Sequence, residues 1–276
     1  KVSTFLREAE KLCDVRVIDY NRSEKIYDNS IFYSNYVTGI SQMMGLSEEV
    51  SHELLVHVNL AMQTLDEKGL SPYRTFDSIS KFAEFLGASR GEAFVPRIST
   101  HRITENTEII LIEPPCGSNT AILRSGGNTL FIDSGYALYR EEMQKLFRSL
   151  IPEYDRMKKQ IFITHADVDH CGLLPLFDEI LSSRKTKECL ELEFKGENGY
   201  REQNPLHKPY VCICKALTFY QPPEPEKIQA LWDTQEEQVN PLEQVGFFDF
   251  GEMHFEVYQG KGGHLAGETV LIDYTH

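Results

Sequence analysis

The sequence lacks features that would point to a membrane, a nucleic acid or a zinc ribbon. No apolar run reaches the roughly 20 residues that a membrane-spanning helix needs, so we expect no membrane association. Lysine and arginine number 28 against 42 acidic residues, and the net charge of −14, without a basic cluster, argues against a nucleic-acid partner. The 6 cysteines include no C-x-x-C pair, which argues against a zinc ribbon.

The composition is that of a folded protein. With 276 residues, of which 41% are hydrophobic, the chain can form one large or two modest domains with real cores. Free thiols in this number suit a reducing compartment, so we expect a cytoplasmic protein. Cys212 and Cys214 stand in an apolar run, residues 210–214, that predicts a buried strand with both thiols facing one side.

The most informative segment is residues 164–172, THADVDHCG. It follows the apolar run 161–163, which predicts a short buried strand, so the segment should lie at the carboxyl end of that strand, where α/β sheets build their sites. Imidazole and carboxylate groups together suit zinc, iron or manganese. Four groups that can bind a metal lie within residues 165–170: His165, Asp167, Asp169 and His170.

The spacing of these side chains fits two metal sites on one loop. His165 and Asp167 are two positions apart and point the same way in an extended backbone, whereas Asp169 and His170 follow a turn and can face a second point nearby. A water that bridges two metals would be acidified and become a nucleophile. The alternative is a polar loop without a metal, in which the neighbouring carboxylates would repel each other.

Residues 164–172 resemble the signature loop of the metallo-β-lactamase fold superfamily, whose usual form is T-H-x-H-x-D-H-x-G. Two further motifs resemble the same family, in the same order along the chain. Residues 117–135 are similar to its opening strands and end in an Asp-x-Gly turn that begins at Asp133. Residues 263–268, GHLAGE, are similar to its later G-H-x-x-G motif, whose histidine is a metal ligand. The resemblance covers residues 106–276.

The resemblance implies an α/β fold, the αββα sandwich of the metallo-β-lactamase type, over residues 101–276. A helix is expected at 141–150, and hairpin strands are expected at 247–258, where apolar and polar residues alternate. The family's bridging aspartate and last histidine ligand are not matched before residue 276. We therefore expect the C-terminal part of the fold, with these two ligands, to lie beyond the sequence.

The resemblance also implies a site for two divalent metal ions. The candidate ligands are His165, Asp167, Asp169, His170 and His264. The first two and His264 would hold one ion, and the other two would hold the second. Asp169 is also the candidate catalytic residue, since it could orient the attacking hydroxide instead. Asp133 would fix the orientation of a metal-binding histidine from behind.

Asp167 departs from the family pattern, which has histidine at this position. A carboxylate there resembles the flavodiiron branch of the superfamily, which carries glutamate and binds iron. An oxygen ligand makes the site harder and more anionic, which shifts its preference from zinc toward iron or manganese. Zinc accepts carboxylate ligands too, so zinc stays a candidate.

These inferences predict a metal-dependent hydrolase. A mono- or dinuclear centre would activate a hydroxide for attack on an ester, thioester, amide or phosphoester bond of a small-molecule substrate. One alternative is a diiron centre, related to the flavodiiron branch, that reduces or senses oxygen or nitric oxide. Another is a non-catalytic binding protein on a degenerate fold. The metal that the protein binds would separate these hypotheses.

Residues 1–100 resemble no known family and are mainly helical in pattern. Residues 29–44 and 47–68 show helical periodicity, and Ser47 followed by two glutamates is typical of a helix start. Residues 15–20 are compatible with a strand, and residues 88–104 are expected to be a connector. Such a helical region suits a homo-oligomer contact, a pocket wall or partner binding.

Overall fold

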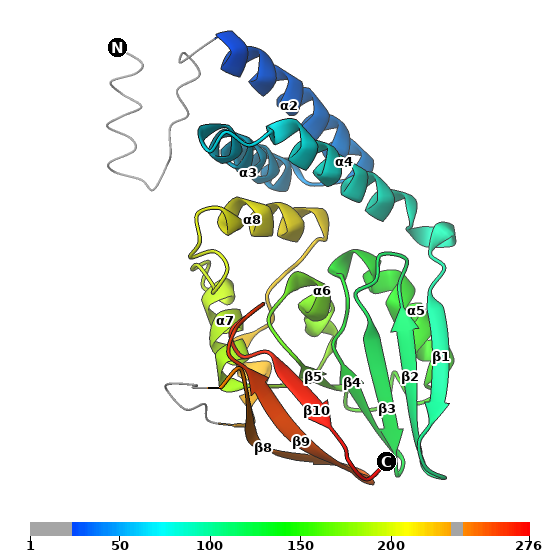
Figure 1. The fold of residues 1–276 in the computed structure, drawn as a ribbon. Coiled ribbons are helices and arrows are strands. Elements are labelled where there is room, and N and C mark those ends of the chain that lie inside the picture. The colour runs from blue at the N-terminus through cyan, green and yellow to red at the C-terminus, as the bar shows by residue number, and fades with distance from the viewer. Residues whose placement is uncertain (1–23, 233–239) are drawn as a thin grey trace.

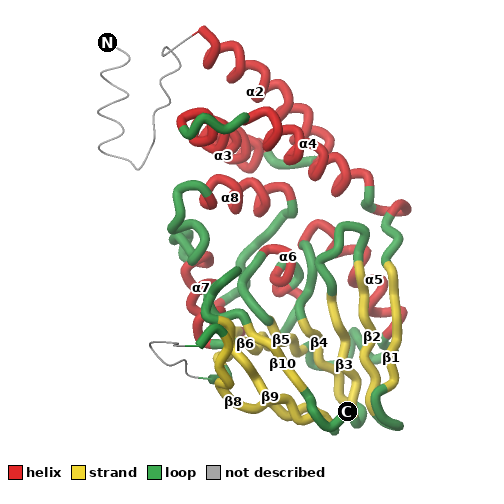
Figure 2. Tube along the Cα trace, viewed as in Figure 1, coloured by secondary structure: helices red, strands yellow, loops and turns green. Residues whose placement is uncertain are grey.

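A computed structural model describes residues 24–232 and 240–276. Its long helices lie at one end of the molecule and its two sheets at the other (Figures 1 and 2). The possible strand at 15–20 lies outside the described residues. Within the two described ranges, no helix combines the length and apolar character needed to cross a bilayer.

The larger sheet has seven strands in sequence order. The first four are antiparallel: β1 (Arg97–Arg102), β2 (Thr107–Glu113), β3 (Thr120–Ser125) and β4 (Asn128–Ile132). The last three continue from β4 in parallel: β5 (Gln160–Ile163), β6 (Glu179–Ser182) and β7 (Ile228–Ala230). Parallel strands need crossover connections, so the loops after β4, β5 and β6 leave the sheet at one shared edge.

The smaller sheet has three antiparallel strands in the order β10-β9-β8. They are β8 (Leu242–Phe250), β9 (Met253–Gly260) and β10 (Thr269–Ile272). The pairing of β8 with β9 confirms the predicted hairpin. The layer between the two sheets consists of buried apolar side chains: Leu123, Leu130, Phe162, Leu181, Met253 and Phe255. The sheets therefore pack face to face, as in a sandwich.

Further helices pack on the other face of the larger sheet or lie beyond the carboxyl ends of its parallel strands (Figure 1). They are α5 (Arg140–Leu150), α6 (Val168–Cys171), α7 (Arg184–Phe194) and α8 (His207–Leu217), with the 3-10 turns η3 (Ala137–Tyr139), η4 (Leu174–Leu176) and η5 (Pro225–Lys227). The helix predicted after the Asp-x-Gly turn is confirmed as α5, which buries Phe147 against Phe131 of β4 with ring centroids 5.0 Å apart. The mixed α/β class expected for this region is thus confirmed.

Three further helices lie above α8 (Figure 1). They are α2 (Glu24–Met44), α3 (Glu48–Glu67) and α4 (Pro72–Ala88), followed by the 3-10 turn η2 (Gly91–Ala93). The helix start predicted at Ser47 is confirmed, because its hydroxyl accepts a hydrogen bond from the backbone N–H of Val50 at 3.3 Å. This cap satisfies one of the N–H groups that lack a partner within the helix.

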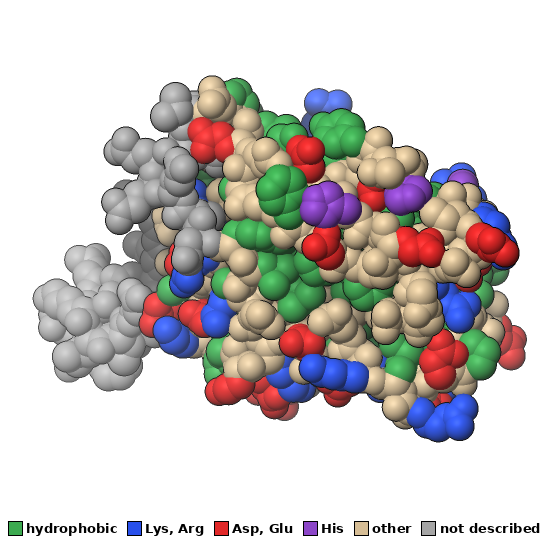
Figure 3. Space-filling model, turned by 90° about the horizontal axis from the view of Figure 1, so that it is seen from below, with side chains coloured by type: hydrophobic (Ala, Val, Ile, Leu, Met, Phe, Trp, Pro, Cys, Tyr) green, Lys and Arg blue, Asp and Glu red, His purple; other side chains and the backbone are tan. Residues whose placement is uncertain are grey.

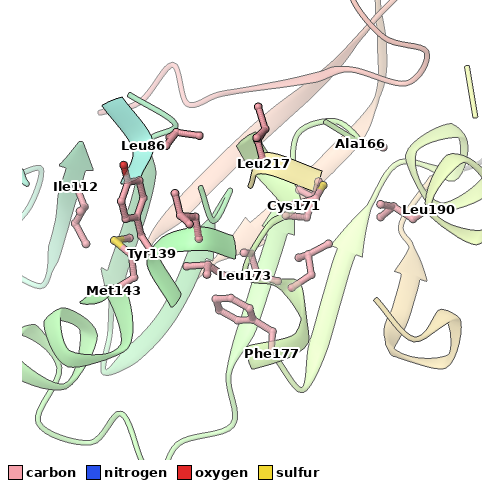
Figure 4. Close-up of a cluster of buried hydrophobic side chains, with 14 of the residues drawn as sticks. Leu86, Ile112, Tyr139, Met143, Ala166, Cys171, Leu173, Phe177, Leu190 and Leu217 are labelled. Carbon is pink, nitrogen blue, oxygen red and sulfur yellow. The ribbon is translucent and has the colours of Figure 1, made fainter. Parts of the chain in front are cut away.

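One apolar core runs from these helices to the larger sheet. Helix α3 contacts α8 as well as α2 and α4, and it buries Leu54, Val58 and Met62. These residues belong to the same cluster as the buried side chains of the sheet, and Figure 4 shows Leu86 of α4 and Leu217 of α8 within it. The division of the chain near residue 100 stays a prediction, and the core extends across it.

The strand predicted at residues 210–214 was wrong, because this run forms the middle of α8. A short apolar run carries no periodicity that separates a helix from a strand. Cys212 and Cys214 therefore lie about 200° apart around a helix rather than on one face. The connector predicted at 88–104 also contains an element, the edge strand β1.

The surface away from the long helices carries charges of both signs. Figure 3 shows this face from below, with lysine and arginine side chains interspersed among acidic and hydrophobic ones. Elsewhere among the described residues, cations also pair with carboxylates, as in Arg124–Glu108 at 3.1 Å and Arg148–Asp155 at 3.0 Å. On the part of this face that the structure describes, the cations form no continuous basic patch of the kind that binds a phosphate backbone.

Candidate metal centre

Three loops that carry predicted site residues meet beside the carboxyl ends of β4 and β5. Asp133 follows β4 and residues 164–172 follow β5, and these parallel neighbours bring both segments to one edge of the sheet. The third loop joins β9 to β10 and carries His264. It is tied to the second loop because the backbone N–H and the hydroxyl of Thr269 donate to the carbonyl of Thr164, at 2.9 and 3.0 Å.

His165, Asp167 and His264 form a cluster in which one possible ligand atom from each lies within 4.8 Å of the others. The Nδ1 atom of His165 is 2.9 Å from the hydroxyl of Thr164, while its Nε2 atom is buried and has no hydrogen-bond partner among the described residues. The Nε2 atom of His264 lies 3.3 Å from Oδ2 of Asp167. A buried nitrogen left without a partner beside imidazole and carboxylate groups fits a divalent metal ion.

The imidazole of His165 is held in its neutral form. Burial lowers its pKa, and the neighbouring His170 lowers it further, to about 4. The ring centroid of His165 is 4.0 Å from that of His170 and 5.0 Å from that of His264. A histidine binds a metal through a deprotonated nitrogen, so this environment favours the ligating form at neutral pH.

Asp133 binds residues 164–172 through its carboxylate and so fixes the shape of this loop. Its backbone lies in the left-handed region, with a φ of 55°, which turns its carboxylate under residues 164–172. One oxygen accepts from the backbone N–H of Thr164 at 2.9 Å, and the other accepts from the Thr164 hydroxyl at 2.8 Å and from Nδ1 of His170 at 2.7 Å. Burial lowers the pKa of His170, but the hydrogen bond and charge of Asp133 outweigh burial and raise it.

Asp169 and His170 form a second pair of candidate ligands beside His165. The bond to Asp133 turns Nε2 of His170 toward Asp169, whose Oδ2 lies 3.5 Å away. Burial raises the pKa of Asp169, although a third of its side chain is exposed. In the part of the chain that the structure describes, this pair does not form a cluster of three possible ligands. The structure thus places all five predicted ligands in one region, three of them around a common point.

The metal loop is fixed to the turn after β4 by close main-chain contacts. The backbone N–H and hydroxyl of Ser134 both donate to the carbonyl of His170, each at 2.9 Å, and the N–H of Gly172 donates to Gly135 at 2.9 Å. A Cβ atom on Gly172 would lie 2.2 Å from the backbone nitrogen of Ala137. Only glycine fits there, because the obstructing atoms belong to the backbone.

Sequence reasoning missed Arg201, which lies on the loop between α7 and α8. Its Nη1 donates to Oδ2 of Asp167 at 2.7 Å, and its Nη2 is 3.5 Å from Nδ1 of His264. The polar stretch around it carries no motif, and it stands 34 positions from Asp167. No local signal could have found this contact.

Cys171 ends α6 without facing the cluster. Its side chain is buried, and its thiol lies 3.4 Å from the carbonyl oxygen of His165 as a hydrogen-bond donor. Burial raises the pKa of this thiol well above its ordinary value. The buried thiol thus hydrogen-bonds to the main chain, which supports a packing role for Cys171.

The chain matches the sequence model of a family described as the metallo-beta-lactamase superfamily over residues 114–265. Among solved structures, it is similar to a flavoprotein from Thermotoga maritima, at 16% identity and a TM-score of 0.42 over 65% of this chain and 40% of that one. It is also similar to the Rm3 metallo-beta-lactamase, at 18% identity and a TM-score of 0.42 over 62% of this chain and 54% of that one. No curated protein matches the chain.

A metallo-beta-lactamase from Cronobacter sakazakii is similar at 14% identity, with a TM-score of 0.41 over 62% of this chain and 58% of that one. The chain therefore spans between 40% and 58% of the length of these three proteins.

Proposed function

Because this chain belongs to the metallo-beta-lactamase superfamily, whose members are mostly metal-dependent hydrolases, we propose that it is such a hydrolase, with a metal held by His165, Asp167 and His264. The observation that supports this proposal most directly is the Nε2 atom of His165. It is buried, has no partner among the described residues, and belongs to a neutral imidazole that faces a carboxylate and a second imidazole. An orphaned buried nitrogen costs stability unless it gains a ligand.

The remaining residues of the loop have distinct roles in this proposal. Asp133 and Thr164 hold His170 and His165 by their Nδ1 atoms, so that both Nε2 atoms turn away from them and into the site. Asp169 is partly exposed beside His170 and can orient a water molecule by accepting its proton in a hydrogen bond. A bound divalent metal supplies Lewis acidity, which acidifies water and polarises an ester, thioester, amide or phosphoester.

A diiron centre for oxygen or nitric oxide is the second candidate function. The observation that favours it is the carboxylate of Asp167, whose Oδ2 faces His264. An oxygen ligand is harder than an imidazole nitrogen, which shifts the preference of the site toward iron. The two functions differ in the metal that binds. Iron with a visible absorption band would support the redox function, whereas zinc or manganese with turnover of generic esters or phosphodiesters would support hydrolysis.

Metal analysis of the purified protein, reconstituted separately with zinc, manganese and iron(II), tests the proposal. We expect between one and two ions per chain by elemental analysis after removal of free metal. The double variant His165→Ala with Asp169→Ala should lose these ions. It removes one ligand from the cluster that contains His264 and one from the pair that contains His170. His52→Ala is the matched control, since His52 is exposed on α3 and should leave the metal content unchanged. Less than one ion in the reconstituted wild-type protein would contradict both catalytic functions.

A further inference from the structure

Arg201 contacts the same carboxylate oxygen that faces His264. Asp167 uses Oδ1 to accept from the backbone N–H of Val168 at 2.9 Å. Its Oδ2 accepts from Arg201 at 2.7 Å and lies 3.3 Å from Nε2 of His264. A carboxylate oxygen has two lone-pair directions, so Oδ2 can serve a guanidinium on one side and a metal on the other. Arg201 thus lies directly behind a candidate ligand.

The neighbours of Arg201 hold it in this position from both sides. The hydroxyl of Tyr200 donates to the carbonyl of Gly262, on the loop that carries His264, at 3.2 Å. Glu202 is buried and pairs with Lys215 of α8 at 2.6 Å. Three consecutive residues therefore tie the two ligand-bearing loops to α8, with the guanidinium between them.

The anchor on α8 is a buried ionic group rather than a surface pair. Lys215 also binds Glu193 of α7 at 3.0 Å, and the hydroxyl of Tyr220 donates to Glu193 at 2.6 Å. A Cβ atom on Gly199 would lie 2.9 Å from the carboxylate of Glu202, so a glycine there lets this side chain fold inward. Buried groups with several partners hold one geometry, which makes the placement of Arg201 a property of the fold.

We propose that Arg201 is a positioning residue whose charge cancels that of Asp167, so that the pair acts toward a divalent metal as a neutral ligand in place of histidine. This inference rests on the proposed function, since it requires a metal on Asp167. The pair is largely withdrawn from water, with exposed side-chain fractions of 25% for Arg201 and 12% for Asp167, so solvent screens the two charges only in part. An aspartate at this position then does not make the site more anionic than a histidine would.

His264 gains nothing comparable from the arginine. If His264 held a metal through Nε2, its ring proton would be on Nδ1, and Nδ1 could not accept a hydrogen bond from a guanidinium, which only donates. The contact of 3.5 Å between Nη2 and Nδ1 is therefore not a bond that survives metal binding. The partner of Arg201 in the loaded site is Asp167, and changes at these two positions should be coupled.

A double-mutant cycle on the full chain tests this coupling. The four proteins are the wild type, Asp167→His, Arg201→Gln and the variant with both changes, and zinc affinity is measured by competition with a chromophoric chelator. Asp167→His should bind zinc at least about tenfold more weakly than the double variant, because it leaves the arginine uncompensated beside a cation; tenfold corresponds to about 1.4 kcal/mol. Adding Arg148→Gln to Asp167→His should restore nothing, since Arg148 pairs with Asp155.

Thermal unfolding of each metal-free variant shows whether it folds. If Asp167→His does not fold, the cycle is repeated with Asp167→Asn, which keeps the shape of the side chain and removes the same charge. Equal zinc affinity with and without Arg201 in these backgrounds would overturn the inference while wild-type binding leaves the proposed function standing. Failure of the wild-type protein to bind zinc, manganese or iron would instead overturn the proposed function.

Discussion

The metal loop and the long helices are held in place by different forces. At the loop, short hydrogen bonds join side chains to the backbone, and Gly172 packs against backbone atoms with no room for a methyl group. In the helical region, α3 contacts α2, α4 and α8 and buries apolar side chains such as Leu54 and Val58. Directional bonds fix positions to within fractions of an ångström, whereas apolar contact rewards buried area and tolerates small shifts. The comparison predicts that the two regions respond differently to the same kind of change.

The largest effect is expected where the loop contacts the turn after β4. Gly172→Ala would place a Cβ atom 2.2 Å from the backbone nitrogen of Ala137 and 2.4 Å from the carbonyl oxygen of Gly135. Neither atom can move without displacing the loop, so we expect a loss of about 4 kcal/mol or more in the free energy of unfolding, together with loss of metal binding. Denaturant unfolding measures the change in free energy, and elemental analysis measures the metal content.

Gly39→Ala is the matched control in the helical region. A Cβ atom there meets nothing within 4 Å, and the glycine lies inside α2. Alanine favours a helix over glycine by up to about 1 kcal/mol, so this variant should be as stable as the wild type or slightly more stable. Equal behaviour of the two alanine variants would contradict the description of the metal loop as a rigid contact.

An intermediate effect is expected from the apolar core around α3. Leu54 is 1% exposed, and Leu54→Ala removes apolar volume from this core, which should lower the free energy of unfolding by about 3 kcal/mol. Because the metal loop is held by its own hydrogen bonds, the folded variant should keep the metal content of the wild type. Loss of metal from folded Leu54→Ala would show that the helices support the site directly.

The smallest effect is expected from pH in the helical region. Burial lowers the pKa of His57 on α3, with Glu53 raising it and Lys208 lowering it, and its Nδ1 atom is buried without a partner among the described residues. Below about pH 6.5 the unfolded chain binds a proton that the folded chain resists, so stability is lost as pH falls from that value through the folded pKa.

The comparison of wild type with His57→Gln isolates this contribution. The variant should lose less stability than the wild type when the pH is lowered from 7 to 5, as measured by denaturant unfolding at each pH. His52→Gln controls for removal of a histidine from the same helix at an exposed position. Identical pH dependence in wild type and His57→Gln would show that burial at this position does not oppose protonation.

Local sequence patterns predicted the secondary structure correctly where residues close in the sequence determine it. The alternation at 247–258 predicted the β8–β9 hairpin, and the cap at Ser47 predicted the start of α3. The run at 210–214 was misassigned because helices and buried strands share short apolar stretches. In the structure this helix packs against α3, and no local window of sequence contains that contact.

The sequence by itself determined the candidate ligands, because their chemistry and spacing in THADVDHCG and GHLAGE are local properties. It also determined the family to which those motifs belong. Only the tertiary structure decided that Oδ2 of Asp167 accepts from Arg201 and that Asp133 holds His170. It also decided that one possible ligand atom each from His165, Asp167 and His264 lie close together. These contacts join residues far apart in the chain, and an ion pair or hydrogen bond forms only where folding brings its two partners within about 3 Å.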